Sequence, residues 1–288
     1  MTFDPKTNKF PYPEITNQHY LHVLKDDGTV FDRNYPYVDK SKKMRFKQFW
    51  MRVALYLIAF PLTRIRLNLK IRGRKNLRKH KAELKQGVVS ICNHVHMWDY
   101  LGVMCALKPY HTYEISWDKN ISGENGKLIR LVGGIPLPID NPLALAKCFN
   151  EINKHLKSGG WLHVYPEGSM WEFYQPIRPF KEGAAYFAVK NNKPIIPLGY
   201  SYRPNGWIRR VLFKSPASFT LNIGEPIYPD TTLEEKEAII KLTIEARNAM
   251  CKLCGIDPNE NIYPPIFDNN KRIDYYTSEY GVGYKKSW

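Results

Sequence analysis

The sequence lacks any apolar run long enough to cross a lipid bilayer. A spanning helix needs about 20 consecutive apolar residues, and the longest nearly apolar stretch is FWMRVALYLIAFPL, residues 49–62, which Arg52 interrupts. The first 45 residues are polar and aromatic and carry no apolar core of the kind found in a secretory signal peptide. We therefore expect neither a transmembrane helix nor a signal peptide.

Cysteine is also scarce. The chain has 5 cysteines in 288 residues, and only Cys251 and Cys254 lie close together. An odd number of scattered cysteines excludes a dense disulfide framework and is typical of a protein from a reducing compartment. The CxxC pair falls in a helical pattern and has no second pair to complete a metal site, so we interpret it as structural.

Acidic residues are few relative to basic ones. The 27 Asp and Glu residues face 43 Lys and Arg residues, which gives a formal charge of +16. Such an excess indicates an anionic partner: a membrane surface, a nucleic acid or a phosphorylated substrate. The charge alone does not choose among the three. A hydrophobic content of 43% predicts a folded protein rather than a disordered one.

The short apolar stretch at residues 49–62 is flanked by basic residues on both sides. This arrangement favours a helix that lies in the interface of an anionic leaflet, with Trp50 and Tyr56 near the headgroups. A buried core helix is the alternative. We predict a peripheral or monotopic protein on the cytoplasmic face of the cell membrane. The flanking basic residues are Lys40, Lys42, Lys43, Arg45 and Lys47 before the stretch and Arg64, Arg66, Lys70, Arg72, Arg74 and Lys75 after it.

After this stretch, strand-like and helix-like patterns alternate, which predicts an α/β domain with a mixed, largely parallel sheet flanked by helices. One predicted helix has Leu143, Ala146, Phe149, Ile152 and Leu156 on its apolar face. We divide the chain into an N-terminal extension with the interfacial helix (1–64), a central domain (65–255) and a tail (256–288). The predicted strands are 67–73, 87–92, 111–116, 160–165, 193–202 and 218–227, and the predicted helices are 97–107, 143–159, 183–191 and 233–255.

The segment NHVHMWD places His94 after a buried strand and Asp99 in the first turn of the next helix. The carboxylate can then hold one imidazole nitrogen and leave the other to take a proton from a hydroxyl group. No G-x-S-x-G sequence is present, which argues against a covalent serine hydrolase. A zinc site built on His94 and His96 lacks a third nearby ligand, and a purely structural His94 at a strand end also remains open.

A second motif, VYPEGSMW, follows another apolar strand, and RPFKEGAAYFAVKNNKPIIPLGY comes after it. Together these segments resemble the glycerophospholipid acyltransferases, the 1-acylglycerol-3-phosphate O-acyltransferases and their relatives. NHVHMWD is similar to the family's Asn-His-x4-Asp block, GGIPLPID stands at its second block, YPEGSM matches Phe-Pro-Glu-Gly-Thr-Arg, and KPIIPLG matches its proline-centred strand. The resemblance extends over roughly residues 65–250.

The resemblance implies direct transfer of a fatty acyl group from a thioester, acyl-CoA or acyl carrier protein, to a hydroxyl group of a lysophospholipid. His94 would be the general base and Asp99 would orient it. No cofactor and no metal would be needed. The residues implied to bind the acceptor or shape its pocket are Asn93, Pro166, Glu167, Gly168, Ser169 and Lys181, and Arg178 and Lys181 are either solvated charges or phosphate ligands.

Two departures from the family pattern concern the acceptor. The second block normally ends in Arg, but residues 133–146 contain no basic residue, and Ser169-Met170-Trp171 stands where the third block has Thr-Arg. A lipid acceptor without a phosphate monoester is therefore an alternative to lysophosphatidic acid, and Lys119, Arg130, Arg178 and Lys181 could replace the missing arginines. A nucleic-acid-binding or non-catalytic lipid-binding protein is the rival class, but no nucleic-acid signature accompanies the charge.

Overall fold

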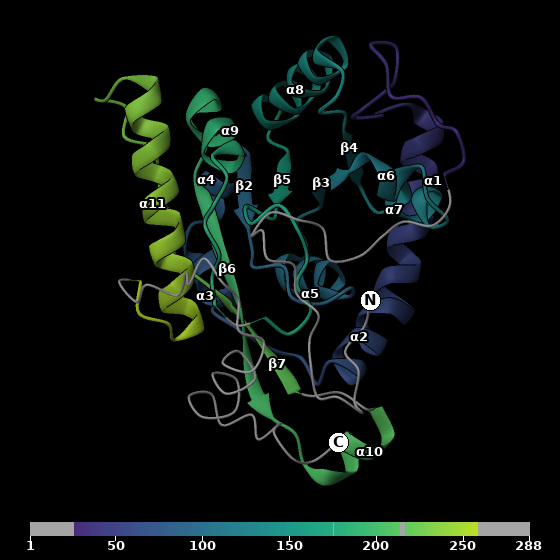
Figure 1. Cartoon of the computed structure of the whole chain (residues 1–288), viewed down its shortest axis with the longest axis vertical. Helices are drawn as coiled ribbons and strands as arrows, with labels where there is room; N and C mark the ends of the chain where they lie inside the picture. The colour runs from purple at the N-terminus through teal and green to yellow at the C-terminus, as the bar shows by residue number, and fades with distance from the viewer. Residues whose placement is uncertain (1–25, 175, 214–216, 259–288) are drawn as a thin grey trace.

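A seven-stranded sheet lies between two layers of helices in the part of the chain that the computed structural model describes, residues 26–174, 176–213 and 217–258 (Figure 1). The strand order is β1-β7-β6-β2-β5-β3-β4, and every neighbouring pair is parallel except β6 and β7. The predicted mixed, largely parallel α/β fold is confirmed. The strands are β1 Lys70–Arg72, β2 Val88–Ile91, β3 Thr112–Trp117, β4 Gly134–Leu137, β5 Trp161–Val164, β6 Ile195–Pro204 and β7 Ala217–Ile223.

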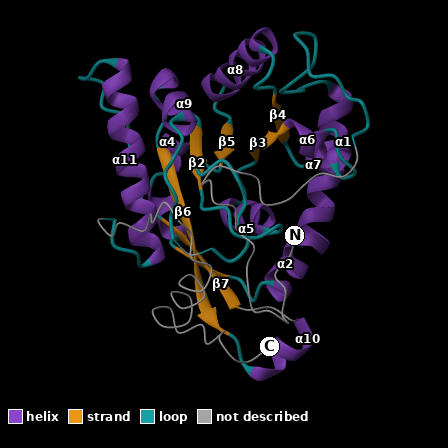
Figure 2. Cartoon of the chain, viewed as in Figure 1, coloured by secondary structure: helices purple, strands orange, loops and turns teal. Residues whose placement is uncertain are grey.

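Two hydrophobic cores lie on the two faces of the sheet, because successive side chains of a strand point to opposite faces. In β2, Val89 and Ile91 join the core beneath α8, α9 and α11, whereas Val88 joins the core that contains α5. Figure 2 shows these helices on either side of the strands. The helices are α3 Arg74–Lys79, α4 Lys81–Leu84, α5 Asp99–Leu107, α6 Asp118–Ile121, α7 Gly126–Leu131, α8 Pro142–Lys157, α9 Gly183–Asn191, α10 Trp207–Phe213 and α11 Glu235–Cys254.

The buried face of α8 differs from the predicted one. Asn141 caps the helix by accepting from the amide of Ala144, and Pro142 occupies the first turn, where it has no amide to leave unpaired. The prediction is right for Ile152 and Leu156 and wrong for Leu143, which is 70% exposed. Ala146 is exposed as well. The buried positions follow a spacing of four residues, through Ala144, Cys148, Ile152 and Leu156, so the face is rotated from the predicted one.

The N-terminal helix is longer than the apolar stretch that predicted it. It consists of α1 (Lys42–Ala54), the π-helical segment η1 (Leu55–Ala59) and α2 (Phe60–Arg66). Ser41 caps its start by accepting from the amide of Met44. The helix is only partly buried, since Leu55 and Phe60 join the core but Leu57 is 72% exposed. None of the helices in the described ranges is long and apolar enough to span a membrane.

The proposed domain boundaries fall near the ends of helices. α2 ends at Arg66, and Gly255, whose φ is +76°, ends α11. The boundaries at 64 and 255 stay predictions. Most of the predicted tail, 256–288, lies outside the described residues.

Candidate active site

Two loops meet at the carboxyl ends of β2 and β5. The strands are parallel neighbours, and Ile91 pairs with Val164 at their ends. His94 and Glu167 each lie three residues beyond this pair, so the register of the sheet places the two sequence motifs beside each other. This edge of a parallel sheet is where α/β proteins usually bind ligands.

His94 and Asp99 form the predicted pair. Nδ1 of His94 lies 2.8 Å from Oδ2 of Asp99, and the ring of Tyr165 stacks on the imidazole at a centroid distance of 3.9 Å. Because a carboxylate only accepts hydrogen bonds, Nδ1 carries the proton and Nε2 carries a lone pair. The described part of the chain forms no hydrogen bond to Nε2, and 25% of the side chain is exposed. The imidazole is thus held in place with its basic nitrogen accessible.

Asp99 is a buried carboxylate surrounded by donors. Besides His94, it accepts from the amides of Val95 (2.9 Å) and His96 (3.2 Å) and from the hydroxyl of Tyr165 (2.7 Å). Burial alone raises the pKa of Asp99, but the charge and hydrogen bond of His94, followed by the bonds from Tyr165 and Val95, hold the pKa below its usual value. Asp99 is therefore ionised and stabilises a positive charge on His94.

Glu167 is a buried anchor rather than an exposed acid in a turn. Its carboxylate accepts from the amide of His94 (3.3 Å), from the amide of Arg178 (3.0 Å) and from Nη2 of Arg178 (2.8 Å). Only 3% of Glu167 and 1% of Arg178 is exposed. The interpretation of Arg178 as a solvated charge or a phosphate ligand is therefore wrong, because its guanidinium is buried against Glu167. The bond from the amide of His94 to Glu167 ties the first loop to the second, and Arg178 holds the carboxylate of Glu167 in place.

The remaining residues of the second loop have different surroundings. Ser169 is buried, and its Oγ accepts from Nη1 of Arg178 at 2.7 Å. Gly168 has a φ of +78° and donates its amide to the carbonyl of Tyr165, and a Cβ there would lie 2.8 Å from Nζ of Lys181. Lys181 is exposed and donates its amide to the carbonyl of Pro166. The ammonium group of Lys181 thus lies directly over the turn at Gly168.

Asn93 connects β2 to β6. Its side-chain amide donates to the carbonyl of Tyr200 (3.1 Å) and accepts from the amide of Tyr200 (2.7 Å). Asn93 is fully buried, so these bonds extend the pairing of the two strands beyond the last backbone pair, Ile91 with Pro197. The side chain fixes the start of the loop that carries His94.

Met170 and Trp171, which stand where the family's third block has its arginine and just after it, lie in the core. Met170 is 9% exposed and Trp171 is fully buried, with the guanidinium of Arg178 over its ring at 4.4 Å. Neither side chain faces solvent, and neither supplies the guanidinium that the family pattern has in this block, so the acceptor preference inferred from them stays a prediction. Arg130 is engaged too, since it donates to the carbonyls of Pro36, Tyr37 and Gly134.

The other histidines near the pair are buried and neutral. Burial lowers the pKa of His96 to about 4 and that of His163 to about 3. Nε2 of His96 lies 3.9 Å from Glu172, and Nδ1 of His163 bonds to the hydroxyl of Ser90. Across the described ranges, no three His, Cys, Asp or Glu side chains gather so as to hold a metal ion.

Two tyrosines that contact the pair of His94 and Asp99 were not predicted from the sequence. Tyr165 stacks on His94 and bonds Asp99, and Tyr200 donates its hydroxyl to the carbonyl of Asp99 at 2.7 Å. Tyr165 directly precedes Pro166 at the end of a strand, which was an available signal. Tyr200 lies about a hundred residues from Asp99 in sequence, and only the pairing of β6 with β2 brings it there.

Three comparisons with known proteins find similarities to acyltransferases and to a related synthase. Residues 68–201 match the family model described as Acyltransferase. An N-acylphosphatidylethanolamine synthase from Arabidopsis thaliana is 32% identical over 100 residues, and the chain spans about a third (35%) of the length of this relative. The crystal structure of the 1-acyl-sn-glycerophosphate (LPA) acyltransferase PlsC from Thermotoga maritima aligns with 75% of this chain and 84% of its own, at 16% identity and a TM-score of 0.47. The matched region 68–201 contains His94, Asp99 and Glu167.

Proposed function

The chain belongs to the glycerophospholipid acyltransferase family, and from this premise we propose that it transfers a fatty acyl group from an acyl thioester to a hydroxyl group of a lysophospholipid. The single observation that carries the proposal is the pair of His94 and Asp99, in which Nδ1 is held at 2.8 Å and Nε2 receives no hydrogen bond from the described residues. The donor is acyl-CoA or acyl carrier protein. The acceptor contributes the nucleophile, so the enzyme needs no covalent intermediate.

The proposed reaction proceeds in two steps at one site. Nε2 of His94 takes the proton of the acceptor hydroxyl as its oxygen attacks the thioester carbonyl. The tetrahedral intermediate then expels the thiolate, which takes the proton back from His94 and leaves as a free thiol, while the new ester bond remains. Asp99 stabilises the imidazolium between the two steps, and Tyr165 keeps the ring in its plane through stacking.

The acceptor's head group is a separate part of the proposal. A phosphate monoester is best held by guanidinium groups, but Arg130 and Arg178 are engaged in bonds to the protein itself. Exposed Lys181 beside Gly168 and exposed Lys119 remain as cations for a phosphate. 1-Acylglycerol-3-phosphate is the first candidate acceptor, and a lipid without a phosphate monoester is the alternative.

We also propose that the protein binds the cytoplasmic surface of an anionic membrane through its N-terminal helix. Exposed apolar side chains of that helix and of α10 support this proposal. The two elements are in contact, because Arg209 of α10 donates to the carbonyl of Arg66, and the side chain of Arg66 donates to the carbonyl of Phe213. Exposed apolar side chains gathered in this way mark an interaction surface. They are Phe46, Phe49, Trp50, Leu57, Ile58, Leu62 and Ile65 on the first helix and Trp207, Ile208, Val211 and Leu212 on α10.

A competition assay tests the function. The purified protein receives labelled acyl-CoA, or the acyl carrier protein thioester, and an equimolar mixture of acceptors in mixed micelles. The acceptors are lysophosphatidic acid, lysophosphatidylglycerol, monoacylglycerol and phosphatidylethanolamine, and mass spectrometry identifies the products. The ester formed from lysophosphatidic acid supports the first candidate, and the ester of another acceptor supports the alternative. An amide formed from phosphatidylethanolamine would contradict transfer to a hydroxyl group. Absence of acyl transfer to every acceptor from both donors would contradict the proposed function.

A further inference from the structure

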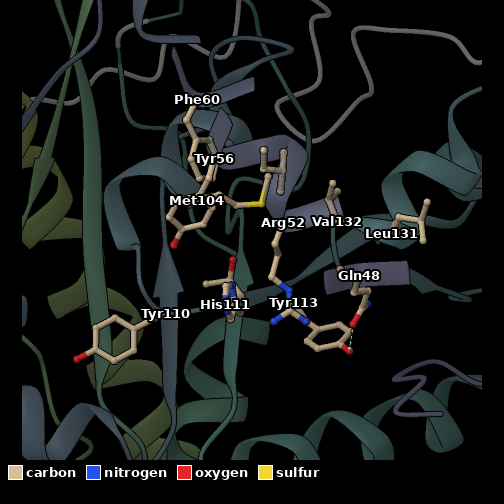
Figure 3. A pocket seen from close by; sticks show the side chains of 13 residues that line it. Gln48, Arg52, Tyr56, Phe60, Met104, Tyr110, His111, Tyr113, Leu131 and Val132 are labelled. Carbon is tan, nitrogen blue, oxygen red and sulfur yellow. Dashed lines mark hydrogen bonds between the residues drawn. The ribbon is translucent and has the colours of Figure 1, made fainter. Parts of the chain in front are cut away.

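A pocket separates the N-terminal helix from the beginning of β3 (Figure 3). Its walls are formed by α1, η1 and the start of α2 on one side, and by β3 and the turn before β4 on the other. No Asp or Glu is among the lining residues. They are Gln48, Arg52, Leu55, Tyr56, Phe60, Met104, Tyr110, His111, Thr112, Tyr113, Leu131, Val132 and Gly133.

Arg52 is the cation of this pocket. Its side chain is half-buried, and within the described residues no carboxylate or carbonyl accepts from its guanidinium. Figure 3 shows the guanidinium directed toward His111, Tyr113 and Gln48. Guanidinium stays charged at any physiological pH, and a charge removed partly from water is stabilised by a counter-ion. The pocket supplies none from its own side chains.

Neutral donors surround this charge. The hydroxyl of Tyr113 lies 3.4 Å from Oε1 of Gln48, which leaves the amide hydrogens of the buried Gln48 for another acceptor. Burial, and then the charge of Arg52, lowers the pKa of His111, so its neutral imidazole supplies one ring N–H. A guanidinium fork with several neutral donors and no acid is the arrangement that recognises phosphate oxygens.

The other wall of the pocket is apolar. Leu55, Phe60 and Met104 belong to the core beside it, and Nζ of Lys108 lies over the rings of Tyr56 and Phe60 at 5.3 and 5.8 Å. A ligand that satisfies both walls carries an anionic head and an apolar chain. We propose that this pocket binds the phosphate group of an anionic phospholipid, with Arg52 as the main contact and the acyl chain along the apolar wall.

This pocket is separate from the acceptor site at His94. Thr112 pairs with Trp161 at the beginning of β5, and Val88 pairs with Trp161 at the beginning of β2. The pocket thus lies toward the amino ends of these strands, whereas His94 follows their carboxyl ends. The bound lipid is therefore distinct from the substrate, and it connects the N-terminal helix to the edge of the sheet. The assignment goes beyond the proposed acyl transfer and does not depend on it.

Isothermal titration of the full chain with dihexanoyl phosphatidylglycerol, kept below its micelle concentration, tests the pocket. Arg52→Gln removes the guanidinium, and Arg45→Gln on the same helix is the matched control, because Arg45 is exposed and outside the pocket. We expect binding to weaken about tenfold or more in Arg52→Gln and to stay unchanged in Arg45→Gln, since hydrogen bonds to charged groups are the stronger ones. Tyr113→Phe, which keeps every charge, is expected to weaken binding less than Arg52→Gln.

A second titration, with glycerol 3-phosphate, identifies the source of the phosphate. Weaker binding than that of the lipid supports the lipid assignment, because the apolar wall then contributes. Binding as tight as that of the lipid would overturn it in favour of a soluble phosphate ester. Equal affinities of Arg52→Gln and Arg45→Gln for the lipid would overturn the site itself. Acyl transfer is not read in these titrations, so their failure and that of the proposed function are distinguishable.

Discussion

At the scale of single residues, the site depends on one buried carboxylate and one accessible imidazole. Asp99 is 1% exposed and receives four hydrogen bonds, whereas His94 keeps Nε2 accessible. Tyr165 serves both residues, through its ring and through its hydroxyl. The aspartate can therefore orient and charge-stabilise the base without being protonated itself.

His94→Ala is expected to lower kcat of acyl transfer by about 10²–10⁴, the usual contribution of a general base. Asp99→Asn is also expected to be severe but to leave residual turnover, because an unoriented imidazole still accepts protons. Steady-state kinetics and circular dichroism of the purified variants measure both effects. His80→Ala is the control, since His80 bonds Glu83 and Glu225 instead. Near-complete activity in folded His94→Ala would end the assignment.

Tyr165→Phe separates the two contributions of this tyrosine. The stacked ring remains, and only the hydroxyl bond to Asp99 is lost. A hydrogen bond to a charged group stabilises by about 1.5–3 kcal/mol, so we expect kcat to fall about tenfold or more while KM changes little. Tyr186→Phe on α9 serves as the matched control. An unchanged kcat in Tyr165→Phe would show that the hydroxyl does not support Asp99.

At the scale of elements, adjacent parallel strands bring the two loops together and side chains lock them. Asn93 ties β2 to β6. Glu167, held by Arg178, accepts from the amide of His94 and so ties the loop after β5 to the loop after β2. The N-terminal helix and α10 are a second pair of elements, whose outer faces are apolar. The first set holds the chemistry, and the second set supports the proposed membrane surface.

Asn93→Ala is expected to reduce the free energy of unfolding by about 2 kcal/mol, because it leaves the buried amide of Tyr200 without its partner and the buried carbonyl of Tyr200 with the thiol of Cys254 alone. Urea unfolding monitored by fluorescence provides the measurement. Asn125→Ala, at an exposed position, controls for the loss of an asparagine. A change as small as that of the control would contradict the proposed bridging role.

Leu57→Gln and Leu212→Gln are each expected to weaken binding to vesicles of phosphatidylglycerol and phosphatidylcholine about tenfold. The reason is that inserting a leucine side chain contributes roughly 1.5 kcal/mol or more. Co-sedimentation measures the bound fraction, and 1 M salt should reduce it without abolishing it. Ile244→Gln is the control, since Ile244 is 55% exposed on α11. Equal vesicle binding by all three variants would contradict the proposal that the apolar faces of the N-terminal helix and α10 bind the membrane.

At the scale of the whole molecule, buried neutral histidines make stability depend on pH. Burial lowers the pKa of His96 and His155 to about 4 and that of His163 to about 3, from 6.5. Below pH 6.5 the unfolded chain takes up protons that the folded chain does not. The free energy of unfolding therefore falls as pH falls from 6.5 toward the folded values.

Urea unfolding between pH 7.5 and 4.5 is expected to show this loss, up to about 1.4 kcal/mol per pH unit for each buried histidine. His155→Gln should flatten the dependence, because one such group is removed. Asp99 contributes in the same direction only at lower pH. Its pKa is depressed below 3.8, so its stabilisation is complete above that value and is lost as pH falls through the folded pKa. A free energy that does not change between pH 7.5 and 4.5 would contradict the prediction.

The sequence by itself determined the class of fold and the chemistry of the first loop. Alternating strand and helix patterns predicted the parallel sheet, because local periodicity reports which side of an element is buried. His94 and Asp99 lie five residues apart, so their contact depends on a single turn and could be predicted locally. The short edge strand β4 was missed, since GIPL carries two residues, Gly and Pro, that are poor strand formers.

Only the tertiary structure determined the surroundings of side chains whose partners are distant in sequence. The sequence left Arg178 open as a solvated charge or a phosphate ligand, yet the fold buries it against Glu167, and Met170 and Trp171 are buried as well. The role of Tyr200 depends on β6, which is distant from β2 in sequence and adjacent to it in the sheet, and the role of Arg52 depends on the packing of α1 against β3. The burial and the partners of a charged side chain depend on how the elements pack against each other. The local sequence pattern therefore could not predict them.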